Sequence, residues 1–215
     1  MGNVFDILSG NETFDYHPLP NKKYSVILCD PNWQFKTFSK KGQGRSAERH
    51  YPTNSVDEIS KLQVENIADK NCALCMWVTD PVLPMAINLA HFWGFNYKTV
   101  LFTWVKINKN KDTYFKGMGY YSRSNPEMCI LFTKGKPLER ASKNVEQLIV
   151  SRIREHSRKP DEAKDRIHQL WGDVPKIELF AREQYDPEHW DYWGNELNKF
   201  DNEEMEIEVD LDEGN

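Results

Sequence analysis

The chain has 215 residues, a formal net charge of −5 at pH 7, four cysteines and 39% hydrophobic residues. This length suits one domain with a single substantial core and excludes two well-stabilised domains. No apolar window reaches the roughly 18 to 20 residues that a membrane-spanning helix needs, and the first residues lack the features of a signal peptide. We therefore expect a soluble, cytoplasmic protein with no membrane partner.

The acidic charge is concentrated at the end of the chain. Residues 201–215 contain eight acidic residues and no basic residue, and without them the net charge of −5 becomes +3. Such a segment repels itself and buries little apolar surface. We expect one folded domain over residues 1–200 and a disordered acidic tail over residues 201–215.

The cysteines predict neither disulfides nor a metal site. Cys29, Cys72, Cys75 and Cys129 lie in apolar segments without the spacing of a disulfide framework, so we expect free, buried thiols in a reducing compartment. Cys72 and Cys75 offer half of a zinc site, but no second pair or histidine partner stands at ligand spacing. We expect no metal ion.

The first predicted strand ends in a cluster of polar and aromatic residues. Val26–Leu28 is part of an apolar run that is typical of a strand buried on both faces. Pro31 ends the strand and keeps Asp30 out of helical geometry. Ligands of open α/β sheets lie beyond the carboxyl ends of the strands, so we expect Asp30, Asn32 and Trp33 at a crevice. For Trp33, the alternative is a core aromatic.

A basic segment with no apolar period follows this turn. Its basic residues are Lys36, Lys40, Lys41, Arg45 and Arg49. Their position directly after the first strand favours contacts with nucleic-acid phosphates, although an ordinary solvated loop has the same composition. Tyr51, at the end of this segment, would offer an aromatic face to a base.

Strands and helices then alternate along the chain. The predicted helices are a short one after Ser55, with Glu58 at capping-box spacing, then Val82–Trp93 and Pro160–Leu170. The predicted strands are Cys72–Thr79, Tyr97–Ile107, Glu127–Thr133, Leu148–Val150, Lys176–Ala181 and Trp190–Trp193. This alternation predicts an α/β fold with a mostly parallel sheet and helices on both faces.

The polar segment Asn108–Asn125 interleaves basic and aromatic residues. They include Lys116 and Arg123 beside Tyr114, Tyr120 and Tyr121. This mixture suits stacking on unpaired nucleotides, and equally a loop whose aromatic residues pack on the domain. Lys106 and Glu127, at the neighbouring strand ends, are expected either to line the pocket or to form structural ion pairs.

Four ordered blocks resemble the adenine N(6)-methyltransferases that use S-adenosylmethionine. The blocks are Asp30-Pro31-Asn32-Trp33, Tyr51-Pro52-Thr53, His156–Glu162, and Lys176–Arg182 with Trp193-Gly194-Asn195. The family includes the catalytic subunit of the mRNA adenosine methyltransferase and many phage and bacterial DNA enzymes. The resemblance covers about residues 24–196 and is most specific in its last two blocks. It implies a Rossmann-like methyltransferase domain with a permuted motif order, the catalytic block preceding the cofactor blocks.

The resemblance also implies the catalytic roles. The Asp30 carboxylate and the Pro31 carbonyl would accept the two hydrogens of an adenine amino group, which exposes its lone pair. Trp33 or Tyr51 would stack on a base taken out of its helix. The family's usual residue at Asn32 is proline, and our hypothesis is that Asn32 preserves the backbone path and the activity.

Cofactor contacts follow from the same resemblance. Lys159 would pair with the methionine carboxylate, while Arg182 and Asn195 would contact the ribose end. Glu178 would order the loop that carries Arg182 or reach the ribose. Glu196 replaces the family's usual glutamine but can still accept hydrogen bonds from ribose hydroxyls.

Two further residues complete the expected cofactor site. Phe180 lies in Leu179–Arg182, which would take the place of the first cofactor loop in the absence of a glycine-rich motif. Asp30 would border the cofactor as well as the substrate. Tyr185 stands where asparagine is common in the family.

The resulting prediction is a methyltransferase that acts on adenine in DNA, in a bacterial or phage-infected cell. DNA is preferred because the compact chain lacks additional RNA-binding domains. The alternatives are an RNA adenine methyltransferase, a catalytically silent nucleic-acid-binding subunit, and a cytosine amino-methyltransferase, whose relatives favour serine in the place of Asp30. A homodimer or a heteromer is expected to hold the nucleic acid.

Overall fold

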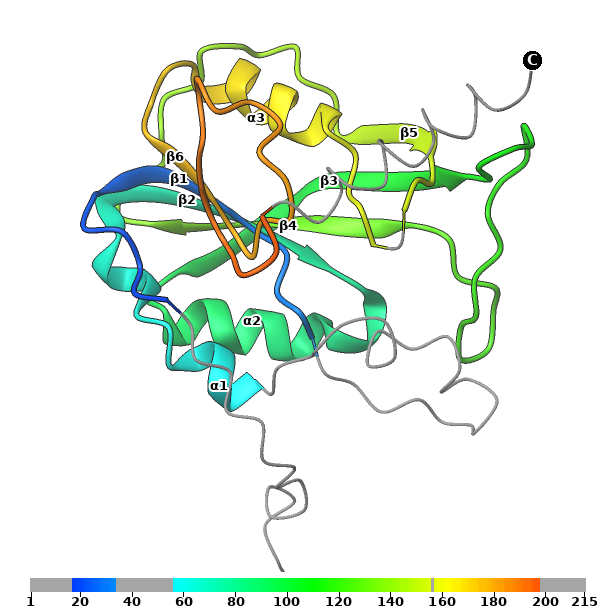
Figure 1. The fold of residues 1–215 in the computed structure, drawn as a ribbon, viewed down its shortest axis with the longest axis horizontal. Coiled ribbons are helices and arrows are strands. Elements are labelled where there is room, and N and C mark those ends of the chain that lie inside the picture. The colour runs from blue at the N-terminus through cyan, green and yellow to red at the C-terminus, as the bar shows by residue number, and fades with distance from the viewer. Residues whose placement is uncertain (1–16, 34–55, 156, 198–215) are drawn as a thin grey trace, which may run out of the picture.

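The computed structural model describes residues 17–33, 56–155 and 157–197. Seven strands form one sheet in the order β5-β3-β4-β2-β1-β6-β7 (Figure 1). They are β1 (Tyr24–Cys29), β2 (Ala68–Val78), β3 (Asn96–Ile107), β4 (Glu127–Lys134), β5 (Leu148–Arg152), β6 (Lys176–Leu179) and β7 (Asp191–Trp193). Each strand expected from the sequence is present, with ends shifted by a few residues.

Helices are few and short in this part of the chain. They are α1 (Val56–Ser60), α2 (Leu83–Phe92) and α3 (Glu162–Trp171), with the 3₁₀ turns η3 (Val64–Asn66) and η4 (Asp80–Val82). The expected cap Ser55 lies outside the described residues. No helix that the structure describes is long and apolar enough to cross a membrane.

The sheet is mixed, so the expectation of a mostly parallel sheet is confirmed only in part. The pairs β1–β2, β1–β6, β6–β7 and β3–β5 are parallel, but β4 is antiparallel to both β2 and β3. The segment 108–126 contains no helix to carry the chain back across the sheet. Without such a crossover the strand after β3 returns antiparallel, and it fills the place between β3 and β2.

Side chains alternate between two cores on opposite faces of the sheet. In β2, Leu74 and Met76 belong to a cluster that includes Leu89 of α2. Cys75 and Trp77 belong to a second cluster that includes Ile167 of α3, and Figure 1 shows α3 opposite α1 and α2. The expected buried thiols are confirmed, because all four cysteines are free and buried.

Strand direction brings the ends of several strands together along one edge of the sheet, at the carboxyl ends of β1 and β6. Because β1 and β6 are parallel, Asp30 and Phe180 leave neighbouring strands at this edge. The antiparallel β4 begins there with Glu127, and β3, which pairs Trp104 with Glu127, ends there just after Lys106. The candidate active site lies along this edge.

Candidate active site

The turn after β1 holds its polar groups close to the sheet. The β1 strand is buried, whereas the Asp30 side chain is 22% exposed. The Trp33 amide donates a hydrogen bond to the Pro31 carbonyl at 2.8 Å, which tightens the turn. A carbonyl oxygen has two lone pairs, so Pro31 retains the capacity to accept a second donor.

Trp33 packs into the core instead of facing the crevice. Its side chain is 7% exposed, and its indole Nε1 donates to the Trp77 carbonyl at 3.4 Å. This placement corresponds to the alternative interpretation of Trp33 as a core aromatic. It anchors the end of the Asp30–Trp33 turn, whereas stacking on a substrate base stays a prediction.

Asp30 is the first member of a buried row of four side chains whose charges alternate in sign. Lys159 Nζ lies 2.7 Å from Asp30 Oδ2 and 3.3 Å from Glu127 Oε2. Lys106 pairs with the other oxygen of Glu127. Since the side chains are only 12–22% exposed, these interactions are weakly screened by solvent. The structure thus decides that Lys106 and Glu127 are ion-pair partners that hold Lys159 against Asp30.

The ionised states of this row reinforce one another. Burial would lower the pKa of the Lys159 ammonium, but the Asp30 and Glu127 carboxylates outweigh it and raise the pKa above its ordinary value. Burial would raise the pKa of Glu127, yet Lys159 and Lys106 reverse the shift and lower it. Lys159 and Glu127 therefore remain charged at neutral pH.

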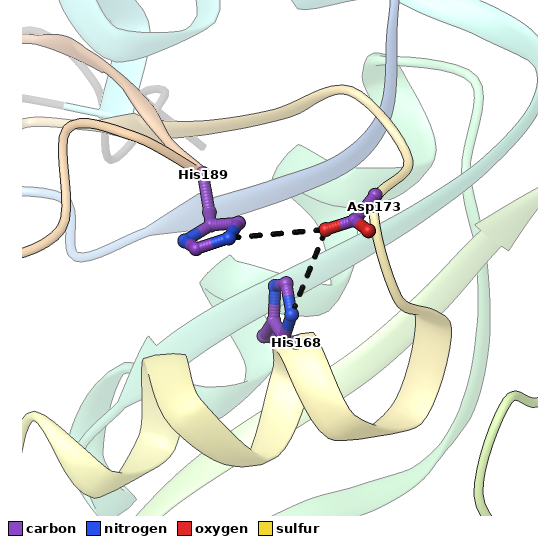
Figure 2. Close-up of side chains that lie close together, drawn as sticks. All are labelled: His168, Asp173 and His189. Carbon is purple, nitrogen blue, oxygen red and sulfur yellow. Dashed lines mark ion pairs between the residues drawn. The ribbon is translucent and has the colours of Figure 1, made fainter.

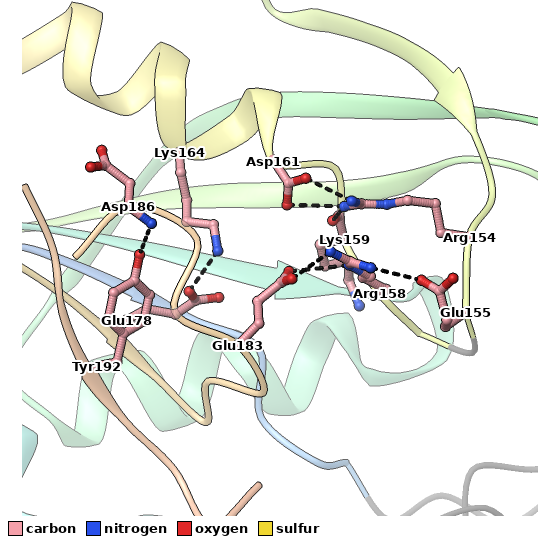
Figure 3. A network of polar contacts seen from close by, with 10 residues as sticks. All are labelled: Arg154, Glu155, Arg158, Lys159, Asp161, Lys164, Glu178, Glu183, Asp186 and Tyr192. Carbon is pink, nitrogen blue, oxygen red and sulfur yellow. Dashed lines mark hydrogen bonds and ion pairs between the residues drawn. The ribbon is translucent and has the colours of Figure 1, made fainter. Parts of the chain in front are cut away.

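The loop that presents Lys159 is fixed by two arginines (Figure 3). Arg154 donates to the Lys159 carbonyl at 2.7 Å and to the Asp161 carboxylate at 2.6 Å. Arg158 donates to the Glu183 carboxylate at 2.6 Å. These charge-assisted bonds tie the loop to the start of α3 and to the segment after β6. The sequence suggested no role for either arginine, because their partners lie in other segments.

The loop after β6 approaches the end of β7 very closely. Phe180 has a left-handed backbone with φ of 62°, and its ring packs edge to face on Trp193 at 5.7 Å between centroids. The Ala181 amide donates to the Trp193 carbonyl at 3.0 Å. A Cβ at Gly194 would lie 2.3 Å from the Ala181 oxygen. Only glycine permits this approach, which explains its place in the last sequence block.

Arg182 connects the two motif turns. Its Nη2 donates to Asn32 Oδ1 at 3.1 Å, and its Nε lies 3.6 Å from Glu196 Oε2. The sequence predicted the place of Arg182 near the cofactor but not its contact with Asn32. A proline at position 32 has no side-chain acceptor, so this bond depends on the variant residue.

Glu178 forms a second buried ion pair, with Lys164 (Figure 3). Its carboxylate lies 3.0 Å from Lys164 Nζ, which also lies over the Tyr185 and Tyr192 rings at 5.4 and 5.6 Å. Burial raises the pKa of Glu178 above its ordinary value, and Lys164 offsets only part of this shift. The ionised Glu178 carboxylate is therefore a strong hydrogen-bond acceptor, and its burial away from water is unfavourable.

One small cavity joins most of the expected cofactor residues. It has a volume of about 30 Å³ and is lined by Asp30, Lys159, Glu178, Phe180 and Arg182, among other residues. The expected Asn195 and Glu196 are not among its lining residues; Asn195 is exposed. Glu196 reaches the site through its ion pair with Arg182.

The expected substrate contacts lie largely outside the described residues. These are Lys36, Lys40, Lys41, Arg45, Arg49 and Tyr51. The cavity of about 550 Å³ beside α1 includes none of the motif residues. Although it is larger and is lined by Glu58 and Lys61, it lacks the acid and the lysine of the motif blocks, so the smaller cavity is the candidate active site.

The mixed seven-stranded sheet and the site, in which an acidic turn after the first strand meets a lysine and a second loop, are consistent with a methyltransferase. The model of the MT-A70 family matches residues 24–196, and the chain belongs to this family. The expected family and the expected enzyme class, an adenine N(6)-methyltransferase, are therefore confirmed.

Curated proteins from several kingdoms resemble the chain. Type II methyltransferase M.MunI of Mycoplasma sp is 37% identical over 195 residues, which cover 83% of this chain and 80% of that protein. A probable N(6)-adenosine-methyltransferase of rice is 30% identical, covering 82% of this chain and 23% of its own length. The human N(6)-adenosine-methyltransferase catalytic subunit METTL3 is 28% identical, with 81% and 28% covered. The chain thus spans about a quarter of the plant and human proteins.

Proposed function

We propose that this protein transfers a methyl group from S-adenosylmethionine to the N(6) amino group of adenine in DNA. The observation that supports this most strongly is the 2.7 Å contact between Asp30 and Lys159. It places the acid of the expected catalytic turn and the lysine of the expected cofactor block in one cavity. The similarity to a bacterial Type II methyltransferase over 80% of its length supports DNA as the substrate.

Asp30 and Pro31 supply the acceptors for the adenine amino group. The lone pair of this amine is delocalised into the ring, so it is a weak nucleophile. Two acceptors that bind its hydrogens favour a more tetrahedral nitrogen and direct its lone pair outward. Because the Asp30–Trp33 turn is held by the core packing of Trp33, the acceptors are positioned before the substrate binds.

The chemistry of the cavity fits S-adenosylmethionine. When bound, this cofactor supplies an activated methyl group on a sulfonium. Lys159 would hold its carboxylate, while Glu178 and Glu196 would accept from its ammonium or ribose hydroxyls. Phe180 adds an apolar wall, and Arg182 and Asn195 add donors at the ribose end.

The cavity in this structure is far smaller than the roughly 300–1,000 Å³ of ligand pockets. Two ion pairs, Asp30–Lys159 and Lys164–Glu178, are formed by residues that line it. A ligand that carries both a carboxylate and an ammonium would replace one partner of each pair. Binding would thereby give Lys159 and Glu178 ligand partners in place of Asp30 and Lys164, so neither Lys159 nor Glu178 is left as an unpaired buried charge.

The loop between β3 and β4 offers a surface for a nucleobase beside the edge of the sheet that carries the candidate active site. Tyr120 and Tyr121 are 74% and 96% exposed, and Tyr114 is 63% exposed. Asn125 fixes the end of the loop to β3: its side chain accepts a hydrogen bond from the Lys106 amide at 3.0 Å and donates one to the Lys106 carbonyl at 2.9 Å. Exposed aromatic rings next to basic residues favour stacking on an unpaired or extruded nucleotide.

The RNA alternative has support from the plant and animal relatives, which are named N(6)-adenosine-methyltransferases. This chain covers only 23% and 28% of those two proteins. The residues of the cavity do not distinguish the two nucleic acids. A location in the cytoplasm of a bacterial or phage-infected cell and a homodimeric or heteromeric assembly stay predictions.

The test is a methylation assay on matched DNA and RNA oligonucleotides, with mass spectrometry of the digested nucleosides. We expect N(6)-methyladenine in DNA. Its appearance only in RNA would establish the alternative substrate, and N(4)-methylcytosine would overturn the choice of base. No transfer, together with oligonucleotide binding and negligible cofactor affinity by calorimetry, would identify a silent subunit.

A further inference from the structure

Three side chains outside the candidate active site converge beside the end of α3 (Figure 2). His168 lies in the last turn of α3, Asp173 in the connection to β6, and His189 in the segment before β7. The Nε2 atoms of His168 and His189 lie 3.7 and 3.9 Å from the same oxygen, Asp173 Oδ1. Ligand atoms of all three residues lie within 4.8 Å of one another. Two imidazoles and a carboxylate thus face a common point.

A second carboxylate orients the His189 ring. Asp186 oxygens lie 2.9 and 3.1 Å from His189 Nδ1. In a neutral ring this contact places the proton on Nδ1, so Nε2 directs a lone pair at the Asp173 oxygen. A cation between the two atoms would turn this repulsion into attraction. A carboxylate behind a histidine is also the common support of a metal-ligating imidazole.

His168 contacts the cluster through its Nε2 atom. Its Nδ1 is buried and has no hydrogen-bond partner among the residues that the structure describes. The polar interaction of this ring is therefore made through Nε2, which faces Asp173. The two rings meet edge to face, with centroids 4.4 Å apart, so both nitrogens approach the carboxylate from adjacent directions.

The spacing is close to that of a tetrahedral metal site. Bonds of 2.0–2.2 Å at a tetrahedral ion separate neighbouring ligand atoms by about 3.3–3.6 Å. The observed separations from Asp173 Oδ1 are 3.7 and 3.9 Å. Small rotations of the side chains would close this difference. Asp173 has a side chain that is 84% exposed and is free to make such an adjustment.

We propose that His168, Asp173 and His189 bind a divalent transition-metal ion, with Zn²⁺ as the best match. Imidazole nitrogens suit Zn²⁺, Co²⁺, Ni²⁺ and Cu²⁺, whereas Mg²⁺ and Ca²⁺ prefer sites built from oxygen ligands. The three protein ligands leave a fourth position for water. Asp186 is the positioning residue, because it contacts His189 and supplies additional negative charge.

The ion would join three segments that are separate in the sequence. It would link the end of α3, the connection to β6 and the segment that leads to β7. The same helix carries Lys164, and β6 carries Glu178, the two members of one ion pair in the candidate active site. The proposal does not depend on the proposed function, since its effect is measured as metal binding and thermal stability.

The experiment uses the full chain after removal of metals by a chelator. Calorimetric titration with Zn²⁺ is expected to show one site per chain, and Zn²⁺ but not Mg²⁺ is expected to raise Tm. His189→Ala and Asp173→Asn are each expected to lose at least about tenfold in Zn²⁺ affinity. Asp186→Asn is expected to weaken binding by about 10- to 100-fold.

His91→Ala is the matched control, because His91 is an exposed histidine on α2, on the other face of the sheet. It is expected to bind Zn²⁺ as the unaltered protein does. Asp173→Asn alters an exposed side chain, so its fold, checked by circular dichroism, should persist even if His168→Ala destabilises α3. The proposal is overturned if no stoichiometric binding is found, or if the cluster variants and His91→Ala bind Zn²⁺ equally well.

Discussion

The Lys159 ammonium lies 2.7 Å from the Asp30 carboxylate, although 129 residues separate the two in the chain. Lys159 also contacts Glu127, so it stands between the turn after β1 and the start of β4. This pair joins the expected catalytic turn to the expected cofactor site. It also means that altering either residue affects the other.

Asp30→Ala and Lys159→Ala are expected to impair different steps. Loss of the Asp30 acceptor should lower turnover by about 10²- to 10³-fold, as does the loss of a comparable electrostatic contact in other active sites. Loss of the Lys159 charge should weaken cofactor binding about 10- to 100-fold, because it removes one charge-assisted hydrogen bond. Steady-state kinetics and calorimetry with S-adenosylmethionine measure the two effects.

Lys143→Ala is the control for Lys159→Ala, since Lys143 is an exposed lysine between β4 and β5. It should leave turnover and cofactor affinity unchanged. Asp30→Asn keeps a polar side chain beside Lys159 and should bind cofactor more nearly like the unaltered protein. An equal loss of cofactor affinity in Asp30→Ala and Lys159→Ala would contradict the division of roles.

Glu127 and Glu178 are expected to affect stability with opposite pH dependence. Although burial opposes it, the Lys159 and Lys106 charges lower the folded-state pKa of Glu127. Its contribution is therefore present at neutral pH and lost as the pH falls through that pKa. Burial raises the pKa of Glu178, so its contribution is present at low pH and lost as the pH rises through the folded-state value.

Glu127→Gln should consequently lower Tm at pH 7 by on the order of 10 °C, because it breaks a buried ion-pair chain. The difference from the unaltered protein should narrow below about pH 4. Glu178→Gln should lower Tm less at pH 7, since it removes the burial cost of the ionised carboxylate at the same time as it deprives Lys164 of its partner. Thermal unfolding followed across pH 3–8 tests both, and a Tm loss of equal size in the two variants would refute the distinction.

Asn32 is expected to act through Arg182, to which it offers a side-chain acceptor at 3.1 Å. Asn32→Ala should weaken cofactor binding about 10-fold, the low end for the loss of one hydrogen bond to a charged group, because its effect passes through Arg182. Asn32→Pro, which introduces the residue usual in the family, should retain turnover within about tenfold of the unaltered protein, because Asp30, Pro31 and Trp33 are unchanged.

A double-mutant cycle with Arg182→Ala measures the coupling directly. If Asn32 acts through Arg182, Asn32→Ala should have little further effect in the Arg182→Ala background. Additive losses of cofactor affinity would show that the two side chains act independently. Complete loss of turnover in Asn32→Pro would instead show that the asparagine is essential to the turn.

Gly194→Ala should displace the Phe180–Arg182 loop. The added Cβ would lie 2.3 Å from the Ala181 oxygen and 2.8 Å from its nitrogen, so the backbone has to move. We expect a lower Tm together with cofactor binding weakened by at least about tenfold. Gly94→Ala is the control: Gly94 has φ of 83° but no atom near its Cβ position. It should lower Tm through backbone strain and leave cofactor affinity unchanged.

Tyr121→Ala should weaken nucleic-acid binding without affecting the fold. The Tyr121 side chain is 96% exposed, so its removal leaves no cavity. Loss of one stacked base should reduce oligonucleotide affinity by about 5- to 100-fold. Fluorescence anisotropy with a labelled adenine-containing oligonucleotide measures this. Phe92→Ala, at a 69% exposed position on α2, is the control. Equal affinity of the two variants would remove the loop from the binding surface.

Local patterns in the sequence determined the position of most elements and the order of the motif blocks. An apolar run ending at Asp30-Pro31 predicts a buried strand with polar groups at its end, and the structure has β1 there. The predicted helix Pro160–Leu170 corresponds to α3, because its apolar residues recur with helical period. The position of a strand or helix depends on residues that are close together in the chain, so it can be predicted from the local sequence.

Only the tertiary structure decided how these elements pair. The insertion of the antiparallel β4 between β2 and β3 brought Glu127 to Lys159, and the adjacency of β1 and β6 brought Arg182 to Asn32. The convergence of His168, Asp173 and His189 has the same origin. Strand order and direction result from packing the whole core, which local periodicity does not specify. The partners of buried charges therefore became evident only once the sheet was assembled.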